Sequence, residues 1–299
     1  MRHRLEYALV WPVVKMLGLL PRPLARAAAI LLAGAVYHLH RRLRRVGVRN
    51  LELAYPQMSR RARRRIVRGV FVSLGRQLAE FCQFPRYTRE TVSQVAVYEG
   101  FENFDAALRR GKGVLFLTAH LGGWEVGSFV HSIHGHRLQI VVRALDNPYL
   151  DRMVERYRTL HGNSTFEKQD FARGLISAMR AGETVGLLMD QNMTPPAGVF
   201  VDFFGIKACT ASGTARVALR TDASVVPAFT IWDATLRKYR ITFGPPLTLP
   251  RTGDDERDVV QATQLFTSVI EEYVRKNPDQ WLWVHRRWKT RPEGEASRY

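Results

Sequence analysis

The fold is decided by one stretch of the chain, GVLFLTAHLGGWEVGSFVHSI at residues 113–133. Its first third is an almost continuous apolar run, which is typical of a buried strand in a parallel sheet. Gly122 and Gly123 then predict a turn, and the apolar residues that follow recur at a helical period. His120 would therefore stand at the carboxyl end of a strand, with Glu125 in the first turn of the next helix. Open α/β sheets bind their ligands at the carboxyl ends of parallel strands.

The alternation of short apolar strands with helices continues on both sides of this stretch. It extends over residues 92–247, which predicts an α/β fold with a central, largely parallel sheet flanked by helices. Residues 59–84 begin with Ser59 as an N-cap and keep apolar side chains on one face, so they predict a long amphipathic helix. We expect residues 46–299 to form one domain, preceded by a helical segment of residues 1–45.

The composition indicates a folded protein with a basic end. The 299 residues are 46% hydrophobic, which is enough for a packed core. The net charge of +18 is concentrated in residues 1–70, where 16 Lys or Arg stand against two acids and leave +14. Such an end suits an anionic partner, which the charge alone leaves open among phospholipid headgroups, an acidic carrier protein and nucleic acid. Cys82 and Cys209 lack metal-ligand spacing, so we expect reduced, buried thiols.

The N-terminal residues predict a membrane anchor. Two apolar runs, residues 7–20 and 24–39, are each shorter than the roughly 20 residues that span a bilayer core, and basic residues interrupt them. We therefore expect helices that lie in the membrane interface or re-enter it. A single span and a helical hairpin packed on its own domain are the alternatives. The basic clusters at residues 41–45 and 60–65 would keep the following chain on the cytoplasmic side.

His120 and Glu125 are the candidate catalytic pair. A neutral imidazole suits a general base, and Glu125 could hold one ring nitrogen as N–H while the other nitrogen takes a substrate proton. The motif holds no serine or cysteine, so a substrate hydroxyl would have to attack, with the amides of Gly122 and Gly123 as oxyanion donors. With nine histidines and 27 acidic residues, chance also produces this spacing, and a merely hydrogen-bonded histidine at a strand end is the alternative. A zinc site is a weaker alternative because it needs three or four convergent ligands.

Other polar residues follow predicted strands and would face the same crevice. Arg143 comes just past one strand, where a guanidinium could clamp a phosphate, although an ordinary surface arginine would look the same. Asp190 and Gln191 end another strand, with a turn or cap role as the alternative. The C-terminal segment QWLWVHRRWKTRP interleaves tryptophans with basic residues, which suits a membrane interface or nucleic acid. Packed tryptophans beside solvated arginines would share this composition.

Five motifs, in this order and spacing, resemble the late acyltransferases of lipid A biosynthesis, the lauroyl or myristoyl transferase family. They are AHLGGWE, VVRALDNPYLDRMVERYR, VGLLMDQN, VFVDFFGIKACTASGTARVALRTDASVVPAF and QWLWVHRRWKTRP. Each motif alone is weak, but together they cover nearly the whole chain. The resemblance implies an enzyme of the inner membrane, acting at its cytoplasmic face, with an α/β fold of the glycerolipid-acyltransferase type.

Such an enzyme moves a fatty acyl group from an acyl carrier protein thioester to a hydroxyl of an anionic glycolipid, and it needs no metal or bound cofactor. The resemblance makes His120 and Glu125 the catalytic pair, and it assigns Arg143 to a phosphate of the acceptor or donor. The other expected substrate-binding residues are Gly122, Gly123, Trp124, Asp190 and Gln191. The implied partners are the acyl carrier protein, the glycolipid and the membrane surface, and not nucleic acid.

One position departs from the family pattern, which commonly reads His-[Phe/Leu]-Gly-Asn-Trp-Glu. Gly123 stands where the asparagine would be, so a side-chain hydrogen-bond donor is missing, while Trp124 remains. The acceptor could therefore be a lipid A precursor or another glycolipid or aminolipid. Two functions of other classes stay open on the sequence: a non-catalytic basic protein that binds anionic membrane or RNA, and a thioesterase with water as acceptor.

Overall fold

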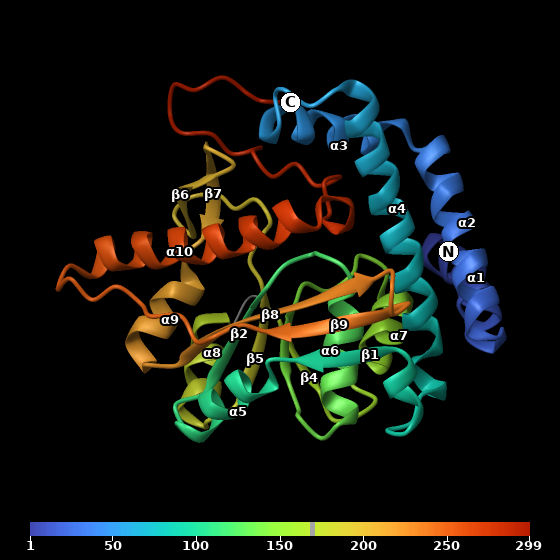
Figure 1. The fold of residues 1–299 in the computed structure, drawn as a ribbon, viewed down its shortest axis with the longest axis horizontal. Coiled ribbons are helices and arrows are strands. Elements are labelled where there is room, and N and C mark those ends of the chain that lie inside the picture. The colour runs from blue at the N-terminus through green and yellow to red at the C-terminus, as the bar shows by residue number, and fades with distance from the viewer. Residues whose placement is uncertain (168–170) are drawn as a thin grey trace.

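A seven-stranded sheet forms the centre of the computed structural model, which describes residues 1–167 and 171–299 (Figure 1). In spatial order its strands are β1 (Ala96–Glu99), β9 (Lys238–Phe243), β8 (Ser224–Asp233), β2 (Val114–Thr118), β5 (Thr184–Leu188), β3 (Gln139–Val142) and β4 (Ser164–Glu167). Neighbouring strands are parallel except for β8 and β9, which form an antiparallel hairpin. The prediction of an α/β fold with a largely parallel sheet is confirmed.

Strand β2 lies inside the sheet and is covered on both faces. It pairs with β8 on one side and with β5 on the other, so neither of its edges is free. Its side chains alternate between two apolar cores: Leu115 and Leu117 join one core, and Val114 and Phe116 join the other. The continuous apolar run in the sequence therefore has a physical cause, because both faces of this strand are buried.

Helices cover both faces of the sheet, as expected. They are α5 (Phe101–Arg109), α6 (Trp124–Ile133), α7 (Pro148–Arg158), α8 (Phe171–Arg180), α9 (Gly213–Thr221) and α10 (Asp255–Lys276). A separate antiparallel hairpin, made of β6 (Gly198–Phe203) and β7 (Ile206–Ala211), packs against α10. Short 3-10 turns cover Phe84–Arg86, Thr91–Gln94 and Pro278–Gln280.

The N-terminal helices pack on one long helix at an edge of the molecule (Figure 1). This helix is α4 (Arg60–Gln83), and its N-cap is Ser59 as predicted, because the Ser59 Oγ accepts a hydrogen bond from the amide of Ala62 at 3.3 Å. Along α4 lie α1 (Arg2–Leu19), α2 (Arg22–Leu39) and α3 (Arg41–Ala54). Gly75 lets α2 approach closely, since a Cβ at this position would lie 2.8 Å from the Cα of Ile30. Helices α1 and α2 are thus packed on the rest of the domain, as in the alternative of a helical hairpin.

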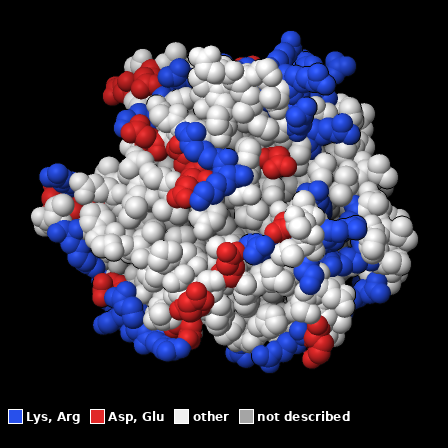
Figure 2. Space-filling model, in the orientation of Figure 1, with Lys and Arg blue, Asp and Glu red and all other residues white. Residues whose placement is uncertain are grey.

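The outer faces of α1 and α2 are nevertheless apolar and exposed. Leucines account for much of this surface: Leu5, Leu9, Leu19, Leu24, Leu31 and Leu39. Among the helices within residues 1–167 and 171–299, none is both long enough and apolar enough to cross a membrane. Lys and Arg side chains gather next to this surface, over α3 and the start of α4 (Figure 2). Attachment of these helices to a membrane interface stays a prediction.

The tryptophans that follow α10 lie in the core. Trp281, Trp283 and Trp288 are at most 1% exposed, and Arg287 is buried with them. The guanidinium is held inside the protein, where its Nη1 donates to the carbonyl of Cys209 at 2.8 Å, and burial lowers its pKa to about 10. The interpretation of this segment as a membrane or nucleic-acid interface is therefore wrong. The tryptophans are packed, as the alternative states, but Arg287 is buried with them and not solvated.

Candidate active site

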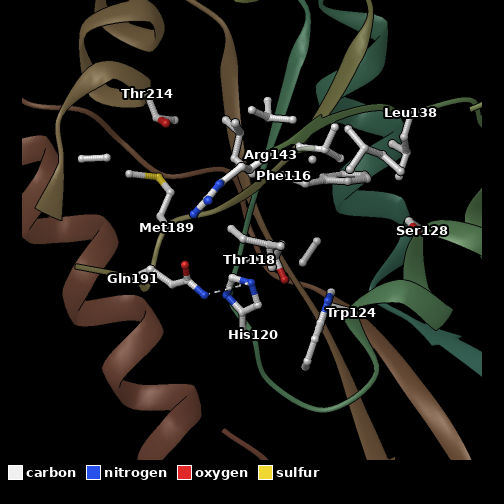
Figure 3. A pocket seen from close by; sticks show the side chains of 18 of the residues that line it. Phe116, Thr118, His120, Trp124, Ser128, Leu138, Arg143, Met189, Gln191 and Thr214 are labelled. Atoms are coloured by element: carbon white, nitrogen blue, oxygen red, sulfur yellow. Dashed lines mark hydrogen bonds between the residues drawn. The ribbon is translucent and has the colours of Figure 1, made fainter. Parts of the chain in front are cut away.

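A cavity of about 920 Å³ opens at the carboxyl ends of β2, β5 and β3 (Figure 3). Part of its wall is apolar: Phe116, Leu138, Ile140, Val141, Ile241 and Phe243. His131 also lines it, and burial lowers the pKa of this histidine to about 3, so its ring is neutral. In Figure 3 Phe116 and Leu138 lie to one side of the His120 ring, and Thr214 lies to the other. The cavity therefore extends to both sides of the predicted base.

Most of the residues expected at the site meet in the same cavity, whereas Asp190 is buried behind its lining. Its lining includes His120, Trp124, Glu125, Arg143 and Gln191. These residues come from the ends of different strands and from the first turn of α6, as the sequence predicts. The carboxyl edge of the parallel sheet is thus the place where the candidate chemistry is assembled.

The ring of His120 is held by Asp190. Its Nδ1 lies 2.8 Å from Oδ1 of Asp190, and its backbone amide donates to Oδ2 of the same carboxylate at 3.0 Å. The register of the sheet explains the contact, because Thr118 lies opposite Leu188 and the residues two positions further along are neighbours. With Nδ1–H donated to the carboxylate, Nε2 is the ring nitrogen that carries the lone pair and can take a proton, and here it accepts a hydrogen bond from the side-chain amide of Gln191 at 3.3 Å.

The environment favours the charged forms of both partners. Burial lowers the pKa of His120, but the charge and hydrogen bond of Asp190 outweigh burial, so the pKa lies above its ordinary value. Burial raises the pKa of Asp190, yet His120 and the N–H of Trp281 bring it below the usual range. Asp190 therefore stays a carboxylate and can stabilise an imidazolium that forms beside it.

The C-terminal segment forms hydrogen bonds with both His120 and Asp190. Trp281 donates its indole N–H to Oδ2 of Asp190 at 2.7 Å, and the amide of Leu282 donates to the carbonyl of His120 at 3.0 Å. Sequence reasoning missed Trp281, because no spacing signal connects it with a strand end 91 residues earlier.

Glu125 pairs with an arginine and not with the histidine ring. The Nε of Arg158, at the end of α7, donates to Oε2 of Glu125 at 2.9 Å, and Nη2 donates to Oε1. The expected contact between Glu125 and a ring nitrogen of His120 is therefore replaced by Asp190. Glu125 still lies in the cavity wall, where its charge adds to that of Asp190 in raising the pKa of His120. Arg158 was not predicted, although it belongs to one of the motifs.

The amides of Gly122 and Gly123 are occupied, which contradicts their expected role as oxyanion donors. Gly122 donates to the carbonyl of Gln280 at 3.0 Å, and Gly123 donates to the carbonyl of Thr230 at 2.8 Å. Close packing explains why both positions are occupied by glycine. A Cβ on Gly122, whose φ is +63°, would lie 2.0 Å from the carbonyl oxygen of Thr230, and a Cβ on Gly123 would lie 2.6 Å from the ring of Tyr239. The asparagine of the family pattern has no room here.

Three further predicted residues line the cavity together with the base. The ring of Trp124 meets the His120 ring edge to face, with 5.2 Å between their centroids. The Nε2 of Gln191 lies 3.3 Å from Nε2 of His120. The Arg143 side chain is 83% exposed and makes one long contact, from its Nη2 to Oδ1 of Asp146 at 3.4 Å.

Within the described part of the chain, no three His, Cys, Asp or Glu side chains are grouped so that they could hold a metal ion.

Comparison with known proteins gives a consistent picture. The family model for bacterial lipid A biosynthesis acyltransferases matches residues 1–290. The chain is 30% identical to the lipid A biosynthesis lauroyltransferase of Escherichia coli K12, over 98% of this chain and 95% of that protein. It is 27% identical to the palmitoleoyltransferase of the same organism, over 84% and 80% of the two chains. It is 26% identical to the myristoyltransferase, over 86% and 78%.

Proposed function

The chain belongs to the family of bacterial lipid A biosynthesis acyltransferases, and from this premise we propose that it moves a fatty acyl chain from an acyl carrier protein thioester to a hydroxyl of a lipid A precursor or a related glycolipid. That it is an acyltransferase follows from the family. The observation that supports the finer proposal is a histidine whose Nδ1 is held by a buried carboxylate, in a cavity with an apolar wall.

In this mechanism His120 is the general base. Its Nε2 takes the proton of the acceptor hydroxyl as the oxygen attacks the thioester carbonyl. The tetrahedral intermediate then collapses, the bond between carbon and sulfur breaks, and the imidazolium returns its proton to the leaving thiolate. Asp190 keeps the ring in the required tautomer and stabilises the imidazolium between these two steps.

Glu125 completes the proposed catalytic pair through its charge. Its carboxylate favours the imidazolium form of His120, and Arg158 keeps the carboxylate in the cavity wall. Because the amides of Gly122 and Gly123 donate elsewhere, the developing oxyanion needs another donor. We assign this role to the side-chain amide of Gln191, which donates to Nε2 of His120 here and would turn to the oxyanion once the acceptor hydroxyl binds at Nε2.

The fatty acyl chain would lie along the apolar wall. Phe116, Thr118 and His120 all line the cavity, so its apolar wall runs along β2 toward the base. The walls near Phe116 carry no charge, since His131 is neutral there. Arg143, exposed at the cavity, is placed to bind a phosphate of the acceptor or of the carrier's prosthetic group.

Two surfaces support the proposed partners and the inner-membrane location. The exposed leucines of α1 and α2 would enter the interface of the bilayer, and the arginines of α3 and α4 would meet its anionic headgroups on the cytoplasmic side. The same basic end of the chain suits an acidic carrier protein as donor.

The test is transfer of a radiolabelled acyl chain from acyl carrier protein to a lipid A precursor by purified protein. We expect His120→Ala to lower the rate by at least about 100-fold, because general-base catalysis contributes on that order. His134→Ala is the matched control, because this histidine lies outside the cavity lining. Full activity of His120→Ala would contradict the mechanism, and release of free fatty acid without labelled lipid would identify a thioesterase instead.

A further inference from the structure

A second cavity, of about 700 Å³, lies between α2, α4 and the β8–β9 hairpin. It shares no lining residue with the acyl-transfer cavity. Its lining holds five cationic side chains and no acidic one: Arg22, Arg26, Arg76, Arg237 and Lys238. Such a concentration of one sign of charge in a concave surface attracts an anion.

The cations of this second cavity are only partly neutralised from within the protein. Glu80, fully buried, binds the Nε atoms of both Arg22 at 3.1 Å and Arg26 at 2.6 Å, so one carboxylate serves two guanidinium groups. The Nη2 atoms of Arg22 and Arg26 are buried and have no hydrogen-bond partner within the described chain. Arg76 makes no hydrogen bond or ion pair in the same part of the chain. The lining therefore carries an excess of positive charge, which an anion that enters the cavity would balance.

Contacts within the protein orient two of these arginines. The guanidinium groups of Arg26 and Arg76 both lie over the ring of Trp232, at 4.5 Å and 4.9 Å from its centroid. The backbone of Trp232 is fixed in turn by the side chain of Gln280, which accepts from its N–H at 2.9 Å and donates to its carbonyl at 3.1 Å. Helix α2 begins at Arg22 without a side-chain cap, so the positive end of its dipole adds to the charge.

The neighbouring surface indicates what kind of anion binds. On α2, the residues next to those that line the cavity include Leu24 and Leu31, which are 57% and 74% exposed. A ligand that binds both the cationic cavity and the exposed leucines of α2 has an anionic head and apolar tails. We propose that the second cavity binds the phosphate headgroup of a membrane glycerophospholipid, separately from the acyl acceptor in the first cavity.

Native mass spectrometry of the protein in a nonionic detergent tests this proposal. The probes are phosphatidylglycerol, phosphatidylcholine, a lipid A precursor and inorganic phosphate. We expect one tightly bound phosphatidylglycerol per chain, and about tenfold weaker binding in Arg76→Gln, because a charge-assisted contact to phosphate is lost. Arg220→Gln is the matched control: it removes the same charge from an exposed position on α9 and should leave the affinity unchanged.

Two further measurements show whether a change in lipid binding arises from a change in folding or in catalysis. Arg76 is half-buried and makes no ion pair within the described chain, so Arg76→Gln should leave the melting temperature of the lipid-free protein unchanged or raise it. His120→Ala should bind phosphatidylglycerol as the unchanged protein does, even though it cannot transfer an acyl chain. Equal phosphatidylglycerol binding by Arg76→Gln would overturn the proposal, and so would preferential binding of inorganic phosphate or of the lipid A precursor at this site.

Discussion

His120 shows how far single residues can be assigned from the sequence. Its position after a buried strand was predictable, and so was that of Asp190 after another. Their contact depends on β2 and β5 being neighbours in a register that pairs Thr118 with Leu188. The sequence predicts that both strands exist, but not their order in the sheet. Glu125, five positions from His120, was therefore the more obvious partner, although Arg158 binds it.

Asp190→Asn should change the pH dependence of the reaction. His120 is a base only when neutral, so activity falls as the pH drops through its raised pKa. Without the charge of Asp190, burial dominates and the pKa of His120 falls, which moves the acidic limb of the profile to lower pH. The maximal rate should drop on the order of 10³-fold, because the ring loses its orientation. The measurement is kcat/KM between pH 5 and 9, and an unmoved acidic limb contradicts the assignment.

The ion pair of Glu125 and Arg158 should show strong coupling in a double-mutant cycle. Arg158→Met alone leaves a carboxylate unpaired in a largely enclosed site, which we expect to cost roughly 1–3 kcal/mol of folding free energy. The double variant Glu125→Gln with Arg158→Met should lose less than the sum of the single variants. Thermal unfolding of the four proteins measures the coupling, and strictly additive losses would show that the pair is not formed.

Among the elements, strands and helices with a strong local pattern were predicted best. Helix α4 begins within one residue of its expected start, and its N-cap is the serine that the sequence indicates. The C-terminal tryptophans were harder, because alternating aromatic and basic residues suit a core as well as a membrane surface. Only the packing around Trp281 distinguishes a core position from a membrane surface, since its indole N–H donates a hydrogen bond to Asp190 inside the protein.

The contact between α2 and α4 should depend on Gly75. In Gly75→Ala the new methyl group would lie 2.8 Å from the Cα of Ile30 and 2.9 Å from the carbonyl oxygen of Ala29, so the helices must separate. We expect a loss of about 1–3 kcal/mol in unfolding free energy, read as a lower melting temperature. Gly34→Ala in α2 is the control, because nothing lies within 4 Å of its new Cβ and helix propensity should add about 0.5–1 kcal/mol. Similar effects in both variants would argue against close packing at Gly75.

At the scale of the whole molecule, the N-terminal helices have two different faces. One face packs on α4, and the other exposes leucines beside a strongly basic surface (Figures 1 and 2). This arrangement suits a protein that lies on a bilayer, and with the proposed attachment the second cavity would lie close to the headgroups.

The double variant Leu24→Glu with Leu31→Glu should therefore leave the membrane. Each leucine contributes about 1.5–3 kcal/mol when its side chain is buried, so we expect at least a tenfold shift from the membrane pellet to the supernatant. Leu108→Glu with Val260→Glu is the matched control, since these side chains are also exposed but lie on α5 and α10. Pelleting of the first variant at the level of the unchanged protein would contradict the membrane orientation.

The sequence by itself determined the fold class, the long helix α4, the basic end of the chain and, through five collinear motifs, the family. These properties follow from local periodicity, composition and order along the chain. Only the tertiary structure decided that Asp190 holds His120, that Arg158 holds Glu125, and that the amides of Gly122 and Gly123 are occupied. The physical reason is that these hydrogen bonds join residues up to 158 positions apart, as in the pair of Gly122 and Gln280. Such contacts depend on strand order, register and the path of the C-terminal segment, which no local pattern encodes.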